Sequence, residues 1–127
     1  MYSVYGDLVL DPFLGTGTTT AAAIAACRNS LGVEICPDLG PAISETVSNA
    51  ICEGAARVKT RVSDHGAFAQ NRSESGCKFK HYNRIHHTPV MTSHEVDLTL
   101  YLPELLEKLS ETRFVVTYRQ ADNLEKL

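Results

Sequence analysis

Residues 8–26, which read LVLDPFLGTGTTTAAAIAA, constrain the fold of this chain more than any other stretch. The apolar run Leu8–Asp11 does not alternate with polar residues, which predicts a short buried strand of a parallel sheet. A glycine turn follows at 15–18, and the five alanines after it predict a helix from Thr18 to about Cys27. A strand, a glycine-rich turn and a helix N-terminus in this order are typical of sites for nucleotide-like ligands.

The next residues extend the same pattern. The stretch NSLGVEI, residues 29–35, predicts a second strand that ends at Glu34 and Ile35. Pro41 suits the first turn of a second helix, which we expect to run to about Cys52. Strand, helix, strand and helix in succession form half of a doubly wound α/β unit. The expected fold class is therefore α/β.

The middle of the chain has two interpretations. Val58 and Val62 lie one helical turn apart and favour a basic helix over 55–75, which SESG would end. Together with Thr60 they also alternate, as they would in a strand over 57–63. Both alternatives remain open from the sequence.

The C-terminal part predicts a hairpin after a connector. Residues 77–94 show little periodicity, whereas VDLTLYL and RFVVTYR predict a C-terminal β-hairpin over 95–119. Pro103 requires an edge position or a bend in that hairpin. These patterns divide the chain into segments 1–54, 55–94 and 95–127.

The composition is that of an ordinary globular chain. Of the 127 residues, 43% are hydrophobic and 21% are charged, which suits one modest domain and argues against disorder. No apolar stretch approaches the roughly 20 residues that span a bilayer. The first residues, MYSVYGD, lack the basic start of a signal peptide. We therefore expect a cytoplasmic protein without membrane contact.

The basic residues concentrate in the middle of the chain. Residues 55–94 hold seven lysines and arginines against two acids, whereas the segments on either side are acidic. Such a segment is either a solvated face or a surface that contacts nucleic-acid phosphates. The residues that would make those contacts are Arg57, Lys59, Arg61, Lys78, Lys80 and Arg84.

No metal site is expected. The histidines of the connector have no acid or cysteine at ligand spacing, so we interpret His81, His86, His87 and His94 as polar residues near solvent or DNA. The four cysteines include no CxxC pair, and reduced structural thiols are expected.

Three kinds of ligand suit a glycine-rich turn. A P-loop requires a lysine in the turn, but the first lysine of this chain is Lys59. The dinucleotide pattern GxGxxG requires a third glycine where this chain has Thr20. S-adenosylmethionine carries an amino group and a sulfonium cation, which suit an acid at the end of the first strand. An acid that ends the second strand, Glu34, can bind both hydroxyls of its ribose.

Residues 6–35, GDLVLDPFLGTGTTTAAAIAACRNSLGVEI, closely resemble the cofactor-binding motif of DNA N4-cytosine/N6-adenine methyltransferases. In that motif a strand ending DPF precedes GSGTT, a helix and a strand ending GIEI. The later KHYN and PVMT, followed by a hairpin, resemble the C-terminal tail of some of these enzymes. The resemblance implies a partial Rossmann-like methyltransferase fold with a C-terminal β-hairpin, S-adenosylmethionine as the cofactor, and DNA in a restriction-modification system as the partner.

The resemblance also implies a cofactor site. It consists of Asp11, Pro12, Phe13, Gly15, Thr16, Gly17, Thr18, Thr19, Glu34 and Ile35. In this site Asp11, Phe13, Gly15 and Gly17 would shape the methionine pocket. Glu34 would bind the ribose, and Thr18 and Thr19 would cap the helix. Cys36 departs from the family pattern, which usually has an acid there.

The catalytic motif of the family is absent. That motif places D, N or S before two prolines and an aromatic residue, to hold the target amine and stack the flipped base. The five prolines of this chain include no adjacent pair, so no catalytic residue is assigned.

In the permuted class of the family, the catalytic half precedes the cofactor half. We therefore expect the cofactor-binding C-terminal portion of a DNA methyltransferase, either a truncated product, a split subunit or an excised fragment. It would be inactive without a separate chain that carries the motif or a homodimer partner. The alternative is a non-catalytic module that binds S-adenosylmethionine or DNA together with a partner chain.

Overall fold

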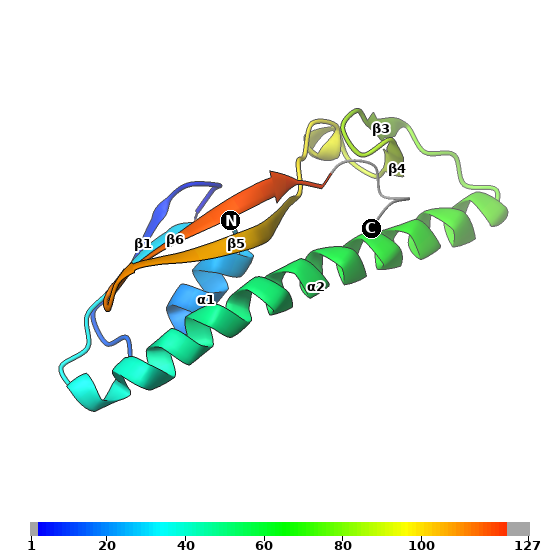
Figure 1. Cartoon of the computed structure of the whole chain (residues 1–127). Helices are drawn as coiled ribbons and strands as arrows, with labels where there is room; N and C mark the ends of the chain where they lie inside the picture. The colour runs from blue at the N-terminus through cyan, green and yellow to red at the C-terminus, as the bar shows by residue number, and fades with distance from the viewer. Residues whose placement is uncertain (1–2, 122–127) are drawn as a thin grey trace. The chain divides into compact units, whose positions relative to one another are not determined.

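The computed structural model describes residues 3–121 and shows a mixed α/β chain with one long helix and a C-terminal pair of strands (Figure 1). The elements in chain order are β1 Leu8–Asp11, α1 Thr18–Ala25, β2 Asn29–Gly32, η1 Pro37–Leu39, α2 Gly40–Glu74, β3 His81–Asn83, β4 Thr88–Val90, η2 Ser93–Glu95, β5 Tyr101–Ser110 and β6 Arg113–Gln120. No helix within this described range is long and apolar enough to cross a membrane.

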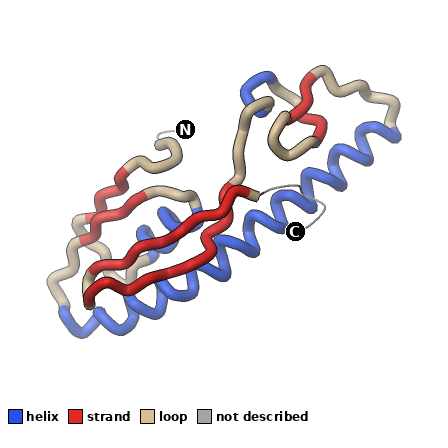
Figure 2. The backbone as a smooth tube through the Cα atoms, turned by 45° about the horizontal axis from the view of Figure 1, so that its top comes forward, coloured by secondary structure: helices blue, strands red, loops and turns tan. Residues whose placement is uncertain are grey.

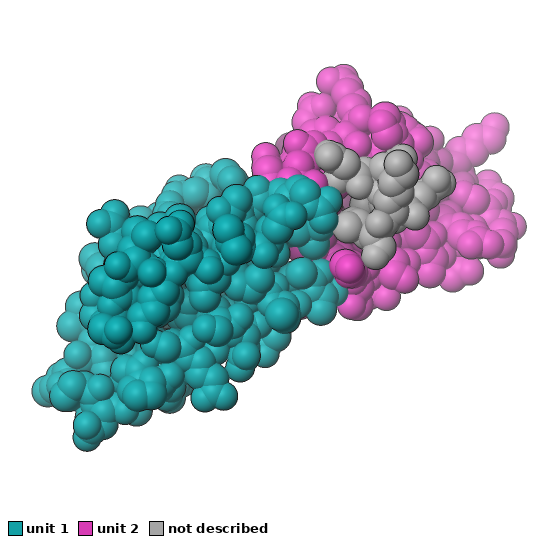
Figure 3. Space-filling view, viewed as in Figure 1, with its two compact units in different colours: residues 1–56, 102–119 teal, residues 57–101, 120–127 magenta. Residues whose placement is uncertain are grey.

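The chain folds as two compact units (Figure 3). Of the described residues, 3–56 and 102–119 form unit 1, and 57–101 with 120–121 form unit 2. The predicted three-segment division of the chain stays a prediction.

β1 and β2 form a two-stranded parallel sheet in unit 1, with α1 as the crossover between them. The register pairs Leu8 with Asn29 at one end and Asp11 with Gly32 at the other. β2 therefore ends at Gly32, earlier than the predicted strand 29–35. This early end leaves Glu34 in the loop that follows β2.

The prediction that β1 is a buried strand is wrong. Only one face of the two-stranded sheet packs against the rest of unit 1, so Leu8 and Leu10 are 64% and 63% exposed. Leu31 of β2 is 55% exposed. The apolar residues of β1 predicted burial on both faces of the strand, but only one face is covered.

The core of unit 1 joins its helices to its C-terminal strands. Ile24 of α1 packs with Val47 and Ala50 of α2, and residues of β5 and β6, including Phe114, pack against them. The hydroxyl of Tyr118 on β6 donates a hydrogen bond of 3.1 Å to the carbonyl oxygen of Ile24. β5 and β6, two of the strands drawn in red in Figure 2, thus pack against α1 and α2.

α2 is one continuous helix of 35 residues. This corrects the prediction of a helix that ends near Cys52 and a second that starts at 55, and it excludes the strand over 57–63. Gly54 is the residue most able to interrupt the helix, but its backbone packs closely under Pro103. A Cβ atom at Gly54 would lie 2.8 Å from Cγ of Pro103. The helix ends at Glu74, and Gly76 then adopts a positive φ of 77°.

The predicted connector over 77–94 contains two strands and a short helix. β3 and β4 form an antiparallel hairpin in which Tyr82 lies opposite Pro89. η2 follows with a capping box, in which the side chains of Thr92 and Glu95 each accept a hydrogen bond from the other residue's backbone amide. The absence of periodicity in this stretch reflects strands of three residues, which are too short to leave a pattern.

The C-terminal hairpin exists, but its first strand is shifted. β5 and β6 form the expected antiparallel pair, and β5 begins at Tyr101 rather than near Val96. Pro103 lies in a strand that has one strand neighbour, which agrees with the predicted edge position. The alternating residues before Tyr101 are held by polar groups instead, since the amide of Leu100 donates to Nε2 of His86.

Candidate functional site

The turn between β1 and α1 depends on two glycines with left-handed backbone. Gly15 and Gly17 have φ values of 56° and 88°, which residues with a Cβ atom rarely adopt. Gly17 is buried, occupies the N-cap position of α1 and donates its amide to the carbonyl oxygen of Leu14 at 3.0 Å. The turn therefore presents bare backbone at the start of a helix, which suits a polar or anionic group.

Asp11 lies at the end of β1 and faces this turn. Its Oδ1 accepts a hydrogen bond of 3.0 Å from the amide of Phe13. A hydrogen bond from the side chain of Thr19 lowers the pKa of Asp11 most, and the bond from the Phe13 amide lowers that pKa further. Asp11 is thus a carboxylate held in place at the mouth of the turn.

Glu34 closes the other side of the turn. Its Oε2 accepts from the amide of Gly15 at 2.8 Å, and its Oε1 accepts from the amide of Cys36 at 2.8 Å. The bonds from Cys36 and Gly15 lower the pKa of Glu34. A carboxylate has about four acceptor positions, so Glu34 can hold both amides and still bind hydroxyl groups. This one side chain thus links two positions that are 19 residues apart in the sequence.

The predicted threonine caps of α1 are not present. The N-cap residue is Gly17, and no side-chain hydrogen bond caps this end of the helix. Thr18 and Thr19 lie inside the first turn, and Thr19 bonds to Asp11 instead. Thr20, where the dinucleotide pattern has a glycine, accepts a 3.2 Å hydrogen bond from the hydroxyl of Ser30 and so joins α1 to β2.

The remaining predicted cofactor residues have exposed side chains, although the backbone amide of Phe13 bonds to Asp11. Phe13 and Ile35 have 85% and 91% of their surface exposed. Pro12, Thr16 and Thr18 are also exposed. Hydrogen bonds thus link Asp11 to Thr19 and Gly15 to Glu34 as two separate pairs, and the side chains of the other predicted residues lie open to solvent.

Leu14 is a part of this site that the sequence reasoning missed. Its amide donates to the carbonyl oxygen of Val33 at 2.9 Å, and its side chain covers Gly32 so closely that a Cβ atom there would lie 2.6 Å away. An apolar residue inside a glycine-rich turn was the available signal. Leu14 therefore fixes the turn against the loop that carries Glu34.

The predicted DNA-contact residues are all exposed in unit 2, on different elements. They are Arg57, Lys59 and Arg61 on α2, Lys78 and Lys80 after it, and Arg84 after β3. On a helix, Lys59 points away from the face that Arg57 and Arg61 share. Arg84 forms an exposed ion pair with Asp97 at 3.3 Å. The six residues therefore do not form one stripe.

The prediction that His86 lies near solvent or DNA is wrong, because His86 is buried in unit 2, whereas His87 and His94 are exposed. His86 is 4% exposed and its Nε2 accepts from the amide of Leu100 at 2.9 Å. His65 on α2 donates from Nε2 to the carbonyl oxygen of Pro89 at 2.8 Å. Over residues 3–121, no group of three or more His, Cys, Asp or Glu side chains could hold a metal ion.

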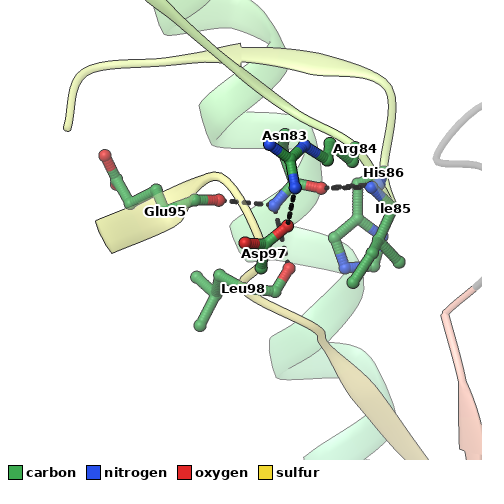
Figure 4. A network of polar contacts seen from close by, with 7 residues as sticks. All are labelled: Asn83, Arg84, Ile85, His86, Glu95, Asp97 and Leu98. Carbon is green, nitrogen blue, oxygen red and sulfur yellow. Dashed lines mark hydrogen bonds and ion pairs between the residues drawn. The ribbon is translucent and has the colours of Figure 1, made fainter. Parts of the chain in front are cut away.

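Asn83 organises the same unit (Figure 4). Its amide nitrogen donates to the carbonyl oxygens of Glu95 at 2.6 Å and Leu98 at 2.9 Å. Its Oδ1 accepts from the amides of Ile85 at 2.9 Å and His86 at 2.7 Å. One buried side chain, 2% exposed, thus fixes two separate backbone segments, and nothing in the sequence pattern marks it.

Comparisons with known proteins place these features in a family. Residues 1–43 match the N6/N4 family model described as DNA methylase, and this range holds the whole turn from Asp11 to Glu34. The type II methyltransferase M.MthZI of Methanothermobacter thermautotrophicus is 36% identical over 96% of this chain, which covers 33% of that relative. The type II methyltransferase M.MjaI of Methanocaldococcus jannaschii is 60% identical over 37% of this chain and 16% of that relative.

A third relative comes from a bacterium. The DNA adenine methyltransferase YhdJ of Escherichia coli is 42% identical over 44% of this chain and 20% of its own length. No solved structure matches the chain. The chain spans a third or less of the length of the curated relatives it matches. Residues 1–43, which hold β1, the glycine turn, α1 and β2, match the N6/N4 DNA methylase family.

Proposed function

We propose that this chain is the cofactor-binding portion of a DNA methyltransferase that acts on the exocyclic amine of adenine or cytosine. The observation that carries the proposal is the turn in which Asp11 and Glu34 are both held as carboxylates around Gly15. The same residues lie inside the range matched by the family model. The partial Rossmann-like fold expected from the sequence is part of this proposal.

The residues of the turn suit S-adenosylmethionine. Asp11 would hold the ammonium group of its methionine part, next to the bare backbone of Gly15 and Gly17. Glu34 would accept hydrogen bonds from its ribose hydroxyls. Phe13, whose amide bonds to Asp11, would border the methionine part, and Ile35 would offer apolar surface to the adenine ring. When bound, the cofactor supplies an electrophilic methyl group. The chain's own residues bind and orient it.

The experiment is a calorimetric titration of the chain with S-adenosylmethionine and with its demethylated product. Asp11→Ala removes the carboxylate, and Gly15→Val places a branched side chain at a positive φ. Both variants should lose binding by at least tenfold. Asp38→Ala removes a nearby exposed acid outside the turn and is the matched control. Binding that persists unchanged in both variants of the turn would contradict the site.

We further propose that basic residues of unit 2 contact DNA phosphates. Glu53 lies one helical turn before Arg57, and Asp64 lies one turn after Arg61, so these two acids reduce the positive charge of that helix face. Residues 75–94 contain no acid, and they include Lys78 and Lys80. Of the six predicted contacts, these two lysines therefore have the strongest case.

DNA binding should be weak, independent of sequence and steeply dependent on salt, because phosphate contacts release counterions. Replacing Lys78 and Lys80 together by alanine should reduce the slope of log affinity against log salt by about 1 to 2, since each contact contributes about 0.9. Lys108→Ala is the control, because Lys108 pairs with Glu111 at 2.8 Å. An unchanged slope in the double variant would exclude a phosphate role for this stretch.

The missing catalytic motif favours a second candidate function. A module that binds S-adenosylmethionine or DNA without catalysis would also need the turn and no adjacent prolines. The two candidates differ in one result: only the first predicts methyl transfer when the missing two thirds of a methyltransferase are supplied.

A further inference from the structure

A hollow of about 790 Å³ lies within unit 1, between strands of its two sheets. β2 forms one wall, with Asn29–Gly32, and β6 forms the other, with residues from Arg113 to Tyr118. Ile24 of α1 and Val47 of α2 lie at its base. The pair β1–β2 runs beside the pair β5–β6 in Figure 2, and residues of β2 and β6 line the hollow between them.

The β2 wall presents unpaired backbone groups of a strand edge. The amides of Asn29 and Val33 donate to the carbonyl oxygens of Asp7 and Asp11, so odd-numbered residues of β2 face β1. In a parallel ladder the residues between them face the opposite side. The backbone N–H and C=O groups of Ser30 and Gly32 therefore point toward the hollow.

Nothing in the described part of the chain pairs with this edge. Among the described strands, β2 has β1 as its neighbour and β6 has β5. Two-stranded sheets are marginally stable by themselves, and free edges recruit further strands. The hollow thus combines a free strand edge, a second strand opposite and an apolar base.

We propose that this hollow receives an extended segment from the part of a DNA methyltransferase that lies outside these 127 residues. The inference rests on the proposed function for the source of the segment. The source of the segment is argued from length. The match to M.MthZI spans 96% of this chain but only 33% of that relative, so two thirds of the relative lie outside the match. The hollow is lined by Arg28 and Arg113 and by no acid, so the segment should combine alternating apolar residues with acidic ones.

The experiment coexpresses the tagged 127-residue chain with the two thirds of M.MthZI that the chain does not match. The two should copurify in a 1:1 complex, and amide exchange at Ser30 and Gly32, followed by NMR, should slow by at least tenfold relative to the chain alone. Failure to copurify would overturn the proposal, and so would a complex in which these two amides exchange as fast as before.

Matched variants test the edge itself. Ser30→Pro removes the outward N–H and should reduce copurification at least tenfold, whereas Ser30→Ala removes only the hydroxyl that contacts Thr20 and should copurify as the parent does. Protection of the Leu31 amide, which faces β1, shows whether the proline variant keeps its sheet. If it does not, the exchange measurement on the unmodified complex still decides.

Two further results distinguish a docked segment from a second copy of the chain and from a failed cofactor site. If sedimentation of the chain alone shows a dimer in which Ser30 and Gly32 are already protected, the occupant is a second copy and the proposal is wrong. If the complex forms with protected edge amides while the isolated chain and the complex both fail to bind S-adenosylmethionine, the cofactor assignment fails and the docking surface stands.

Discussion

Asn83 connects two backbone segments of unit 2 through four hydrogen bonds. Asn83→Asp keeps both acceptor bonds but turns a carboxylate oxygen toward the carbonyl oxygens of Glu95 and Leu98. We expect this variant to lower the free energy of unfolding by about 2–4 kcal/mol, because a buried donor is replaced by a charge. Urea denaturation followed by circular dichroism measures the loss.

The control for Asn83 is its neighbour in the chain. Arg84 pairs with Asp97 at 3.3 Å, but both side chains are at least 70% exposed. Arg84→Ala should therefore cost about 0–1 kcal/mol. Equal losses for Asn83→Asp and Arg84→Ala would show that the buried network contributes no more than an exposed ion pair.

Tyr118 offers a prediction with a defined pH. Burial, together with the nearby Cys27 and Tyr5, raises the pKa of Tyr118 to about 12. Its contribution to stability is therefore complete below about pH 10, where unfolded tyrosine titrates, and is lost as the pH rises to about 12. A rapid pH-jump absorbance titration should show a late phenolate component that Tyr118→Phe removes and Tyr82→Phe retains. A late component that survives in Tyr118→Phe would assign it to another tyrosine.

Among single residues, the sequence predicts those that belong to a local motif of strand, turn and helix. Asp11 was predicted from its position at the end of the first strand, and Glu34 from its position at the predicted end of the second strand. The structure links Glu34 to the amide of Gly15 and bonds Asp11 to Phe13. Asn83 was not predicted, because its partners lie 12 and 15 residues away and leave no periodic signal. The threonine caps were wrong because Gly17, not a threonine, occupies the N-cap position.

Among the elements, α2 is the one whose continuity the sequence did not predict. The sequence predicted a helix to about Cys52 and a second helix from 55, but α2 continues through Gly54, whose missing side chain makes room for Pro103. Gly54→Ala should gain up to about 1 kcal/mol in helix propensity. It should lose more through the contact with the Pro103 ring, for a net loss of about 1–2 kcal/mol.

Gly66 supplies the matched comparison in the same helix. A Cβ atom there meets nothing within 4 Å, so Gly66→Ala should stabilise the chain by about 0.5–1 kcal/mol. Thermal unfolding of both variants, and of Gly54→Ala combined with Pro103→Ala, measures the coupling. If Gly54→Ala stabilised the chain as Gly66→Ala does, the close packing of α2 under β5 would be contradicted.

The elements that the sequence predicts correctly have strong local patterns. β1, α1 and β2 follow from an apolar run, an alanine-rich stretch and a glycine turn. β5 was misplaced because the alternating residues 96–102 look like a strand, although polar groups of β3 and its turn hold much of that backbone. Side-chain bonds to a backbone far along the chain compete with strand pairing, and sequence periodicity does not report them.

The whole molecule offers the glycine turn that we propose as a cofactor site in unit 1 and basic residues in unit 2, but it lacks the family's catalytic motif. A bound cofactor alone leaves its methyl group without an oriented acceptor, and correct orientation contributes roughly 7–11 kcal/mol of the barrier reduction. The chain alone should therefore transfer no tritiated methyl group to mixed-sequence DNA. Addition of the unmatched two thirds of M.MthZI should restore transfer, and Asp11→Ala should abolish it again. Transfer by the 127-residue chain alone would place catalytic residues within it that neither its prolines nor its described side chains reveal.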